Sequence, residues 1–303
     1  MSDVRFAGVE LGGTKCVCVR GTGDGEIHAA VRVPTRDPET TMAEIEAVLD
    51  GWRAEKGGFA GLGIASFGPL DLDRTSPGYG RVVATSKPGW SGADVAGRLE
   101  RRYGVPTGFQ TDVAGAAVAE GRWGAARDLD DFAYVTVGTG IGVGLVVGGR
   151  PLIGLTHPEA GHIRVKRLAG DPWPGSCPYH GDCVEGLASG SAIAARTGRP
   201  GAEIGPDDPV WAPVAHALGE LAHTLVLTVA PRRIIIGGSV MLGQPHLYPR
   251  VRAALKASLA GFGRSDELLA DLDGYVVPPM LGNDAGPKGA LALAADARAA
   301  MEK

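Results

Sequence analysis

Residues 4–20 read V-R-F-A-G-V-E-L-G-G-T-K-C-V-C-V-R: a short apolar run, a glycine turn and a second apolar run. Residues 26–33 then place apolar side chains at every second position, which is the spacing of a half-buried strand. The glycine-rich segment 21–26 before them is typical of a hairpin turn. The sequence therefore predicts that the chain opens with three consecutive, antiparallel strands.

Strands and helices alternate after this opening, and the pattern starts again after Asp112. Apolar spacing predicts helices over 38–56, 91–103 and 112–125 and strands over 62–67, 108–111, 132–137 and 141–147. Further on it predicts helices over 209–229 and 247–259, strands over 233–236 and 275–278, and a last helix from 285. These two similar halves predict a small N-terminal lobe (1–112), on which helix 288–303 packs back, and a larger lobe (113–287).

The composition fits a folded protein that binds a small molecule. Of 303 residues 44% are hydrophobic, the mean hydropathy is +0.04, and 30 basic side chains stand against 34 acidic ones with no basic block. We therefore expect no nucleic-acid partner and no membrane partner. No secretory leader is visible, so we expect a cytoplasmic protein. The 48 glycines exceed the usual share, and we interpret those outside the nucleotide turns as compositional bias.

Four glycine turns follow apolar strands, at residues 11–15, 138–142, 237–239 and 282–286. Glycine lets backbone N–H groups approach a phosphate, although any single turn of this kind is more often only a tight turn. Neither the P-loop nor the dinucleotide fingerprint is present, because Val143 and Leu145 stand where a final glycine is required. Two of the turns carry Thr14 and Thr139, which favours a two-lobed clamp holding phosphate from both sides.

Two carboxylates lie at the ends of predicted strands. Asp112 could accept the proton of a hydroxyl that attacks a phosphate, or it could only be the N-cap of the following helix. Glu10 could hold magnesium through water, or it could be a solvated strand end.

A metal site is predicted by the spacing of Cys177, His180 and Cys183, with His162 upstream. Four nitrogen and sulfur ligands would close a tetrahedral zinc site, which indicates a structural metal; a cysteine pair or plain burial is the alternative. Cys16 and Cys18 alternate with valines and are interpreted as strand residues of the core. Glu159 and Glu185 flank the metal loop and could bind sugar hydroxyls or lie exposed on the surface.

The chain resembles the ROK sugar kinases of the actin-like ATPase superfamily. The resemblance spans Glu10 to about Gly289 and rests on ELGGTK, TDVAGAA, VGTGIGVG, PEAGH, the CPYHGDC loop and IIIGGS. It implies an α/β, two-lobed actin-like ATPase (ribonuclease H-like) fold with mixed sheets, ATP and magnesium as cofactors, structural zinc and a homodimer. The stretches IASFGPLDLD, Tyr79-Gly80 and TSKPGW are most similar to bacterial fructokinases, so the resemblance implies conversion of D-fructose to fructose 6-phosphate.

The resemblance also implies a role for each candidate residue. Asp112 would be the base, Glu10 would hold magnesium, and the phosphates would face Gly12, Gly13, Thr14, Lys15, Gly138, Thr139 and Gly140. Gly237, Gly238 and Ser239 would lie near adenosine; Thr111, Asp112, Glu159, His162 and Glu185 near the sugar; and zinc would be bound by His162, Cys177, His180 and Cys183. Ala114 departs from the asparagine common in the family. Alternatives are a glucokinase, a mannokinase, a broad-specificity hexokinase or a non-catalytic sugar-sensing regulator.

Overall fold

The computed structural model describes residues 4–55 and 58–302, which fold into two compact α/β units. Unit 1 comprises Met1–Trp123, Pro151–Pro158 and Asn283–Lys303, and unit 2 comprises Gly124–Arg150 and Glu159–Gly282. This division differs from the predicted one, because the helix that begins at Asp112 and the segment 151–158 belong to unit 1. The physical reason is that this helix packs against the C-terminal helix and the unit 1 sheet. The boundary of the functional lobes stays a prediction.

Unit 1 is built on a five-stranded mixed sheet with strand order β3-β2-β1-β4-β5. Its elements are β1 (Arg5–Leu11), β2 (Lys15–Thr22), β3 (Ile27–Pro34), α1 (Pro38–Ala54), β4 (Leu62–Ser66), α2 (Ala96–Tyr103), β5 (Thr107–Thr111), α3 (Asp112–Trp123), η3 (Gly282–Asp284) and α11 (Ala285–Met301). The three opening strands pair antiparallel, as predicted, and β1, β4 and β5 are parallel. The predicted end of the first helix at Lys56 and of the last at Lys303 lies outside the described residues.

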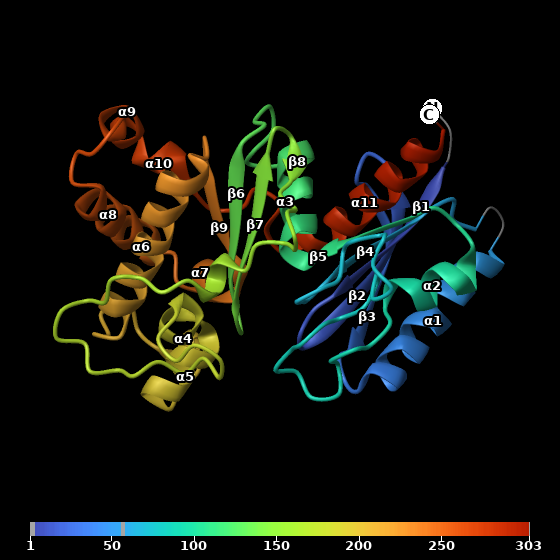
Figure 1. The fold of residues 1–303 in the computed structure, drawn as a ribbon, viewed down its shortest axis with the longest axis horizontal. Coiled ribbons are helices and arrows are strands. Elements are labelled where there is room, and N and C mark those ends of the chain that lie inside the picture. The colour runs from blue at the N-terminus through green and yellow to red at the C-terminus, as the bar shows by residue number, and fades with distance from the viewer. Residues whose placement is uncertain (1–3, 56–57, 303) are drawn as a thin grey trace. The chain divides into compact units, whose positions relative to one another are not determined.

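Helices cover both faces of this sheet (Figure 1). On one face, α1 and α2 bury Met42, Ile45 and Leu99 against apolar strand residues. On the other face, α11 crosses β1, β4 and β5 and contacts α3. The carboxyl ends of the parallel strands, where ligands of open α/β sheets bind, therefore lie between two helical layers.

Close packing of α11 explains many glycines that we interpreted as compositional bias, and that interpretation is wrong for them. A Cβ added at any of five such positions would come within 3 Å of an atom across the contacts among α11, α3 and the sheet: Gly8, Gly61, Gly63, Gly108 and Gly115. The tightest is Gly63, whose added Cβ would lie 1.8 Å from the carbonyl oxygen of Ala290. Glycine lets the backbones of the helix and the sheet approach each other at these places.

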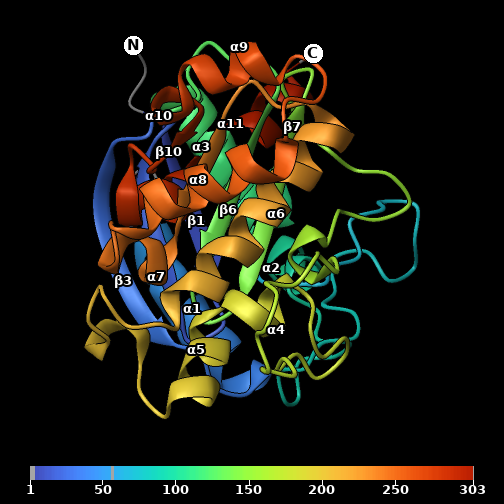
Figure 2. The ribbon, with the colours of Figure 1, turned by 90° about the vertical axis from the view of Figure 1, so that its left-hand side faces the viewer.

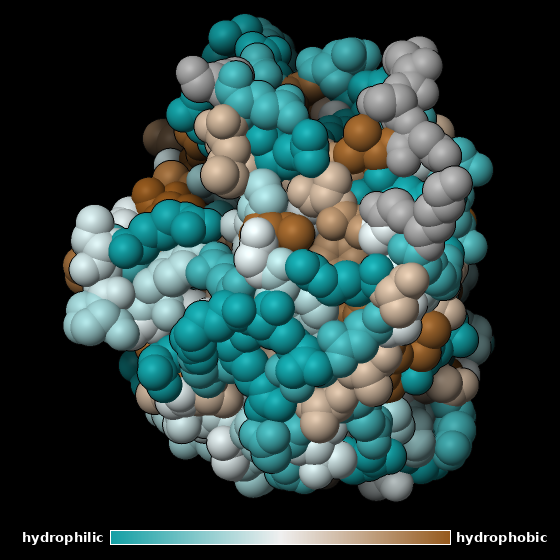
Figure 3. Space-filling view, turned by 90° about the vertical axis from the view of Figure 1, so that its right-hand side faces the viewer, coloured by the Kyte–Doolittle hydropathy of each residue, from teal (hydrophilic) through white to brown (hydrophobic). Residues whose placement is uncertain are grey.

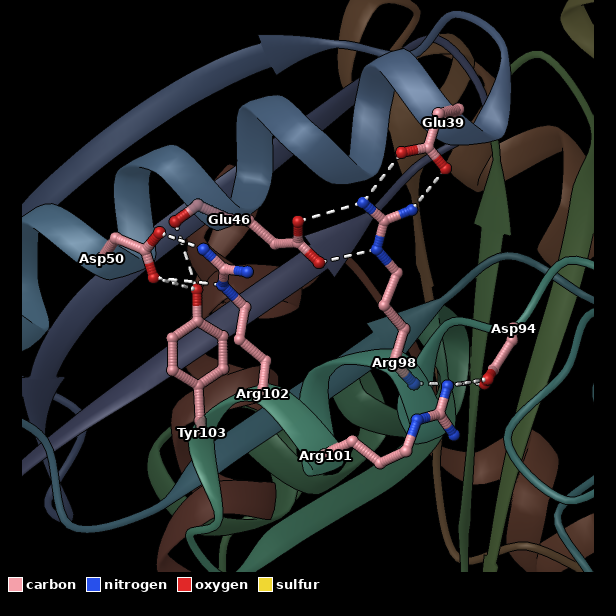
Figure 4. A network of polar contacts seen from close by, with 8 residues as sticks. All are labelled: Glu39, Glu46, Asp50, Asp94, Arg98, Arg101, Arg102 and Tyr103. Atoms are coloured by element: carbon pink, nitrogen blue, oxygen red, sulfur yellow. Dashed lines mark hydrogen bonds and ion pairs between the residues drawn. The ribbon is translucent and has the colours of Figure 1, made fainter.

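The helix predicted from residue 91 begins only at Ala96. The reason is that the preceding residues pair with an extended segment: Asp94 forms a bridge with Arg81, and Val82 N–H donates to the Ala93 carbonyl at 3.0 Å. Ion pairs then fix α2 on α1 (Figure 4). Arg98 binds Glu39 and the nearly buried Glu46, both at 2.6 Å.

Unit 2 is built on a second five-stranded mixed sheet with strand order β10-β9-β6-β7-β8. Its strands are β6 (Phe132–Val137), β7 (Ile141–Val147), β8 (Arg150–Pro151), β9 (Ile234–Gly237) and β10 (Val276–Val277). Its helices are η1 (Ala160–His162), α4 (Val184–Ala188), α5 (Gly190–Thr197), η2 (Gly201–Glu203), α6 (Trp211–Val229), α7 (Gly238–Gly243), α8 (Leu247–Leu259), α9 (Ser265–Ala270) and α10 (Leu272–Tyr275). Helices α6 and α8 lie side by side and cover this sheet (Figure 2).

Helix α6 is long and apolar enough to cross a membrane, but half of that apolar stretch is buried inside the protein. Trp211, Leu218 and Leu225 belong to the core of unit 2. It is therefore a core helix. The face of the molecule in Figure 3 is mostly hydrophilic, with hydrophobic residues scattered over it, as is usual for a protein surface.

Candidate functional site

In the turn between β1 and β2, all three carbonyl groups accept a hydrogen bond. The Thr35 hydroxyl donates to the Gly12 carbonyl at 2.7 Å, and Thr35 N–H donates to the Thr14 carbonyl at 3.0 Å. Lys87 Nζ donates to the Gly13 carbonyl. Within residues 4–55 and 58–302, the N–H groups of Gly13 and Thr14 have no hydrogen-bond partner. Unpartnered N–H groups at a glycine turn suit an anion.

The two glycines of this turn differ in what they do for the fold. A Cβ added at Gly12 would lie 2.7 Å from the carbonyl oxygen of Lys15, to which Gly12 N–H donates. A Cβ added at Gly13 would meet nothing within 4 Å. The fold therefore needs glycine at position 12. At position 13 the fold has room for a side chain, so glycine would be needed there only if a ligand approaches the backbone closely.

Asp112 is the first residue of α3, and the structure decides against its interpretation as the N-cap. The Thr111 hydroxyl accepts from Ala114 N–H at 3.1 Å and so caps the helix. Asp112 Oδ1 instead accepts from the next amide, Val113 N–H, at 2.8 Å. Thr111, predicted near the sugar, therefore uses its buried hydroxyl for capping, and the Asp112 carboxylate is free for another role.

Glu10 and Asp112 lie at the carboxyl ends of parallel strands of the same sheet, and the charge of Asp112 acts on Glu10. Burial, and then the negative charge of Asp112, raise the pKa of Glu10 to about 7. Burial raises the pKa of Asp112 to about 6. The Glu10 carboxylate also abuts the first turn of α11, because a Cβ added at Gly286 would lie 2.0 Å from its Oε1. Two shielded carboxylates with raised pKa values beside a turn with unpartnered N–H groups are typical of a catalytic centre.

In unit 2 the predicted turns come together. In the β6–β7 turn, Gly138 N–H donates to the Gly140 carbonyl at 2.9 Å, and the Gly138 carbonyl accepts from Gly190 N–H at 2.7 Å. Gly238, with φ of +87°, lies so close to β6 that an added Cβ would come 2.4 Å from the carbonyl oxygen of Val137. A Cβ on Gly138 would in turn lie 3.8 Å from Ser239 Oγ. The structure thus joins the turns 138–140 and 237–239 at one edge of the sheet.

The four predicted metal ligands form a cluster whose donor atoms all lie within 4.8 Å of one another. His162 Nδ1 lies 3.6 Å from both Cys177 Sγ and Cys183 Sγ, and His180 Nδ1 lies 3.7 Å from Cys177 Sγ. Tetrahedral zinc with bonds of about 2.3 Å to sulfur and about 2.0 Å to nitrogen places these atoms about 3.6 Å apart. The cysteines are free thiols. The cluster therefore fits a tetrahedral zinc site with two sulfur and two nitrogen ligands.

Glu185 links this cluster to the β6–β7 turn. Its Oε2 accepts from Ile141 N–H at 3.0 Å, and its Oε1 lies 3.9 Å from His162 Nε2. At 3.9 Å the Glu185 carboxylate lies beyond hydrogen-bond distance of this imidazole. Glu159 is exposed at the start of η1, and Gly161 lets η1 approach β7, where an added Cβ would lie 1.9 Å from the Ile141 carbonyl oxygen. The predicted sugar contacts of Glu159, His162 and Glu185 stay predictions.

Thr35 and Lys87, which hold the β1–β2 turn, were not predicted as site residues. Lys87 lies in the TSKPGW stretch, which indicated the family but gave no role to the lysine. No local signal identifies Thr35, because it reaches the turn only through the pairing of β2 with β3.

The chain is similar to known proteins over nearly its whole length. It is 40% identical over 289 residues to the putative fructokinase of Bacillus subtilis, covering 95% of both chains. It is 40% identical to the fructokinase of Zymomonas mobilis, covering 94% of this chain and 95% of the other. A ROK family glucokinase from Streptomyces griseus, crystallised with glucose and AMPPNP, superposes with a TM-score of 0.77 at 26% identity over 96% of this chain and 99% of the other. The model of the ROK family matches residues 6–297. The chain therefore belongs to the ROK family.

Proposed function

We propose that this ROK sugar kinase transfers the γ-phosphoryl group of ATP to D-fructose and forms fructose 6-phosphate. Four relatives named fructokinase or putative fructokinase, 34–40% identical over 94–95% of this chain, support the substrate. The observation that carries the chemistry is the free, half-buried Asp112 carboxylate beside Glu10 and the unpartnered N–H groups of the β1–β2 turn.

Asp112 is proposed as the base. It accepts the proton of the sugar hydroxyl while that oxygen bonds to the γ-phosphorus and the bond from phosphorus to the bridging oxygen breaks, releasing ADP. Because burial raises its pKa to about 6, the carboxylate is ionised at neutral pH yet remains a stronger base than an exposed aspartate. We expect the rate to fall as the pH drops through this value.

The phosphates are proposed to bind the β1–β2 turn through Gly13 and Thr14, with Gly12 and Lys15 completing it. The support is the set of unpartnered N–H groups and the open space at Gly13. In unit 2 the phosphates are proposed to bind Gly138, Thr139 and Gly140, with Gly237, Gly238 and Ser239 near the adenosine. Backbone N–H groups would stabilise the charge that develops during transfer without reorganising.

Two metals are proposed. Glu10, a shielded carboxylate close to Asp112, has the hard oxygen donors that Mg²⁺ prefers and would hold it through water. When bound, magnesium would neutralise part of the negative charge of the phosphates. Structural zinc would be bound by the cluster of His162, Cys177, His180 and Cys183, whose spacing fits it.

The sugar is proposed to contact Glu159, His162 and Glu185, with Thr111 holding the helix that carries Asp112. We also propose that the protein is a cytoplasmic homodimer, which size-exclusion chromatography with light scattering tests. Ala114, buried behind the cap, offers no hydrogen bond to a hydroxyl; the side-chain contacts that select the hexose must come from other residues.

The test is ADP release from Mg·ATP with fructose, glucose and mannose, coupled to NADH oxidation. We expect fructose to give the highest kcat/KM. Equal values for the three hexoses would contradict the fructose assignment and leave the kinase chemistry in place. ADP release that no hexose stimulates would contradict the proposed function itself.

A further inference from the structure

A lysine of the TSKPGW stretch is held over the β1–β2 turn by a rigid loop. Trp90 is fully buried; its Nε1–H donates to the Arg36 carbonyl at 2.8 Å, and its ring lies edge-on to Phe67 at 5.0 Å. The Thr85 hydroxyl accepts from Lys87 N–H at 3.3 Å. The backbone that carries Lys87 is therefore fixed on both sides of the residue.

The ammonium group of Lys87 lies at the turn without a carboxylate partner. Nζ donates to the Gly13 carbonyl and lies 5.8 Å from the centre of the Phe67 ring. None of the ion pairs among the described residues includes Lys87. Arginines of the same unit, such as Arg98 and Arg102, are paired with glutamate or aspartate. The Lys87 ammonium group therefore lies beside the unpartnered N–H groups of the β1–β2 turn.

We propose that Lys87 binds the phosphoryl group that is transferred, through a charge-assisted hydrogen bond from Nζ. This inference rests on the proposed function. The N–H groups of Gly13 and Thr14 and the Lys87 ammonium are donors at the same turn, so a phosphoryl oxygen bound by the amides comes within reach of Nζ. Lysine is a compact, flexible cation, and it can exchange the neutral carbonyl of Gly13 for a phosphate oxygen. The same phosphoryl group lies on ATP before the transfer and on the sugar after it.

A purely structural role predicts a different pattern. If Lys87 only holds the Gly13 carbonyl, its loss disturbs the turn and weakens ADP and ATP alike. If Lys87 binds the transferred phosphoryl group, its loss weakens the ligands that carry this group and spares ADP and fructose. The ratio of two dissociation constants therefore separates the two roles.

The experiment is calorimetric titration of wild-type protein, Lys87→Met and Lys87→Arg with Mg²⁺ and either the β,γ-imido analogue of ATP, ADP or fructose 6-phosphate. A lost charge-assisted hydrogen bond predicts a Kd about tenfold higher for the ATP analogue in Lys87→Met, with a change below about threefold for ADP. Lys87→Arg keeps the charge and should recover most of the affinity. Lys256→Met, an exposed lysine on α8, is the matched control.

Each outcome decides. A selective loss for the ATP analogue, for fructose 6-phosphate or for both supports the proposal and shows on which ligand Lys87 acts. Equal losses for the ATP analogue and ADP, or no loss, would overturn it, and if Lys87→Met does not fold, Lys87→Gln replaces it in the same comparison. If the wild-type protein phosphorylates fructose and Lys87→Met binds the ATP analogue and fructose 6-phosphate with wild-type affinity, only this inference is refuted. Wild-type protein without hexose-dependent turnover refutes the proposed function instead.

Discussion

Replacing Glu10 by glutamine should make the protein more stable at alkaline pH, in the absence of magnesium and nucleotide. The Glu10 carboxyl group is shielded beside Asp112, and its pKa rises from 4.5 to about 7. The folded state therefore binds this proton more tightly than the unfolded state does. The stability that this proton contributes is fully present below pH 4.5 and is lost as the pH rises through about 7. Glutamine has the same shape and no charge to bury.

The magnitude follows from linkage between proton binding and folding. A shift of this size makes the Glu10 contribution to the unfolding free energy fall by roughly 2 kcal/mol between pH 5.5 and pH 8.5. Asp112, whose pKa rises to about 6, adds a smaller decline in both proteins. The wild-type curve should therefore fall more steeply with pH than that of Glu10→Gln, by about that amount.

Urea unfolding followed by tryptophan fluorescence across this pH range measures the difference directly. Glu26→Gln removes an exposed carboxylate from the β2–β3 turn of the same unit and is the matched control; it should keep the wild-type pH dependence. Parallel curves for wild type and Glu10→Gln, or a variant that is less stable at pH 8.5, would show that Glu10 is not shielded as described.

Three further predictions concern the turn, the metal cluster and the ion pairs of unit 1. Gly13→Ala should leave the unfolding free energy unchanged or raise it by up to about 1 kcal/mol, because the added Cβ meets only open space. Calorimetry should nevertheless show clearly weaker ATP binding. A loss of stability that accompanies the loss of binding would contradict this prediction. Cys177→Ser should lower both the zinc content, measured by atomic absorption, and the melting temperature, whereas an unchanged melting temperature would argue against a structural metal. Arg98→Met leaves the 11%-exposed Glu46 carboxylate unpaired and should lower the free energy of unfolding in urea by about 2 kcal/mol. The double variant Arg98→Met/Glu46→Gln should restore most of this loss. No recovery would mean that the arginine acts through packing alone.

The sequence predicted most of the sheet and the long helices, because their apolar spacing is a local property. Strands 132–137 and 141–147 and helix 247–259 begin and end where they were predicted. The short helices α4, α5 and α7 were not predicted, because too few turns carry a periodic pattern. Helix α2 starts later than its pattern suggests, because residues 92–95 take backbone partners from an extended segment, residues 80–82.

The candidate site was predicted as motifs, and the structure added how they are held. The glycine-threonine turns and the metal cluster could be found from spacing, because their residues are close in sequence. The Thr35 contacts, the capping by Thr111 and the Lys87 contact depend on strand pairing and side-chain direction. The glycines that pack against α11 could not be predicted, because no local sequence pattern distinguishes them from other glycines. Only the contact between the helix and the sheet shows why they are needed.

The central claim is that Asp112 is the base of a sugar kinase, and Asp112→Asn tests it most directly. The variant keeps the size of the side chain and removes its ability to accept a proton. Asp128→Asn, an exposed residue with φ of +68° that asparagine tolerates, is the control. With ATP and fructose, Asp112→Asn should lose about a hundredfold to ten-thousandfold in kcat and keep its affinity for ATP, because a general base typically contributes about 10²–10⁴ to the rate. Turnover at the wild-type rate would contradict the account.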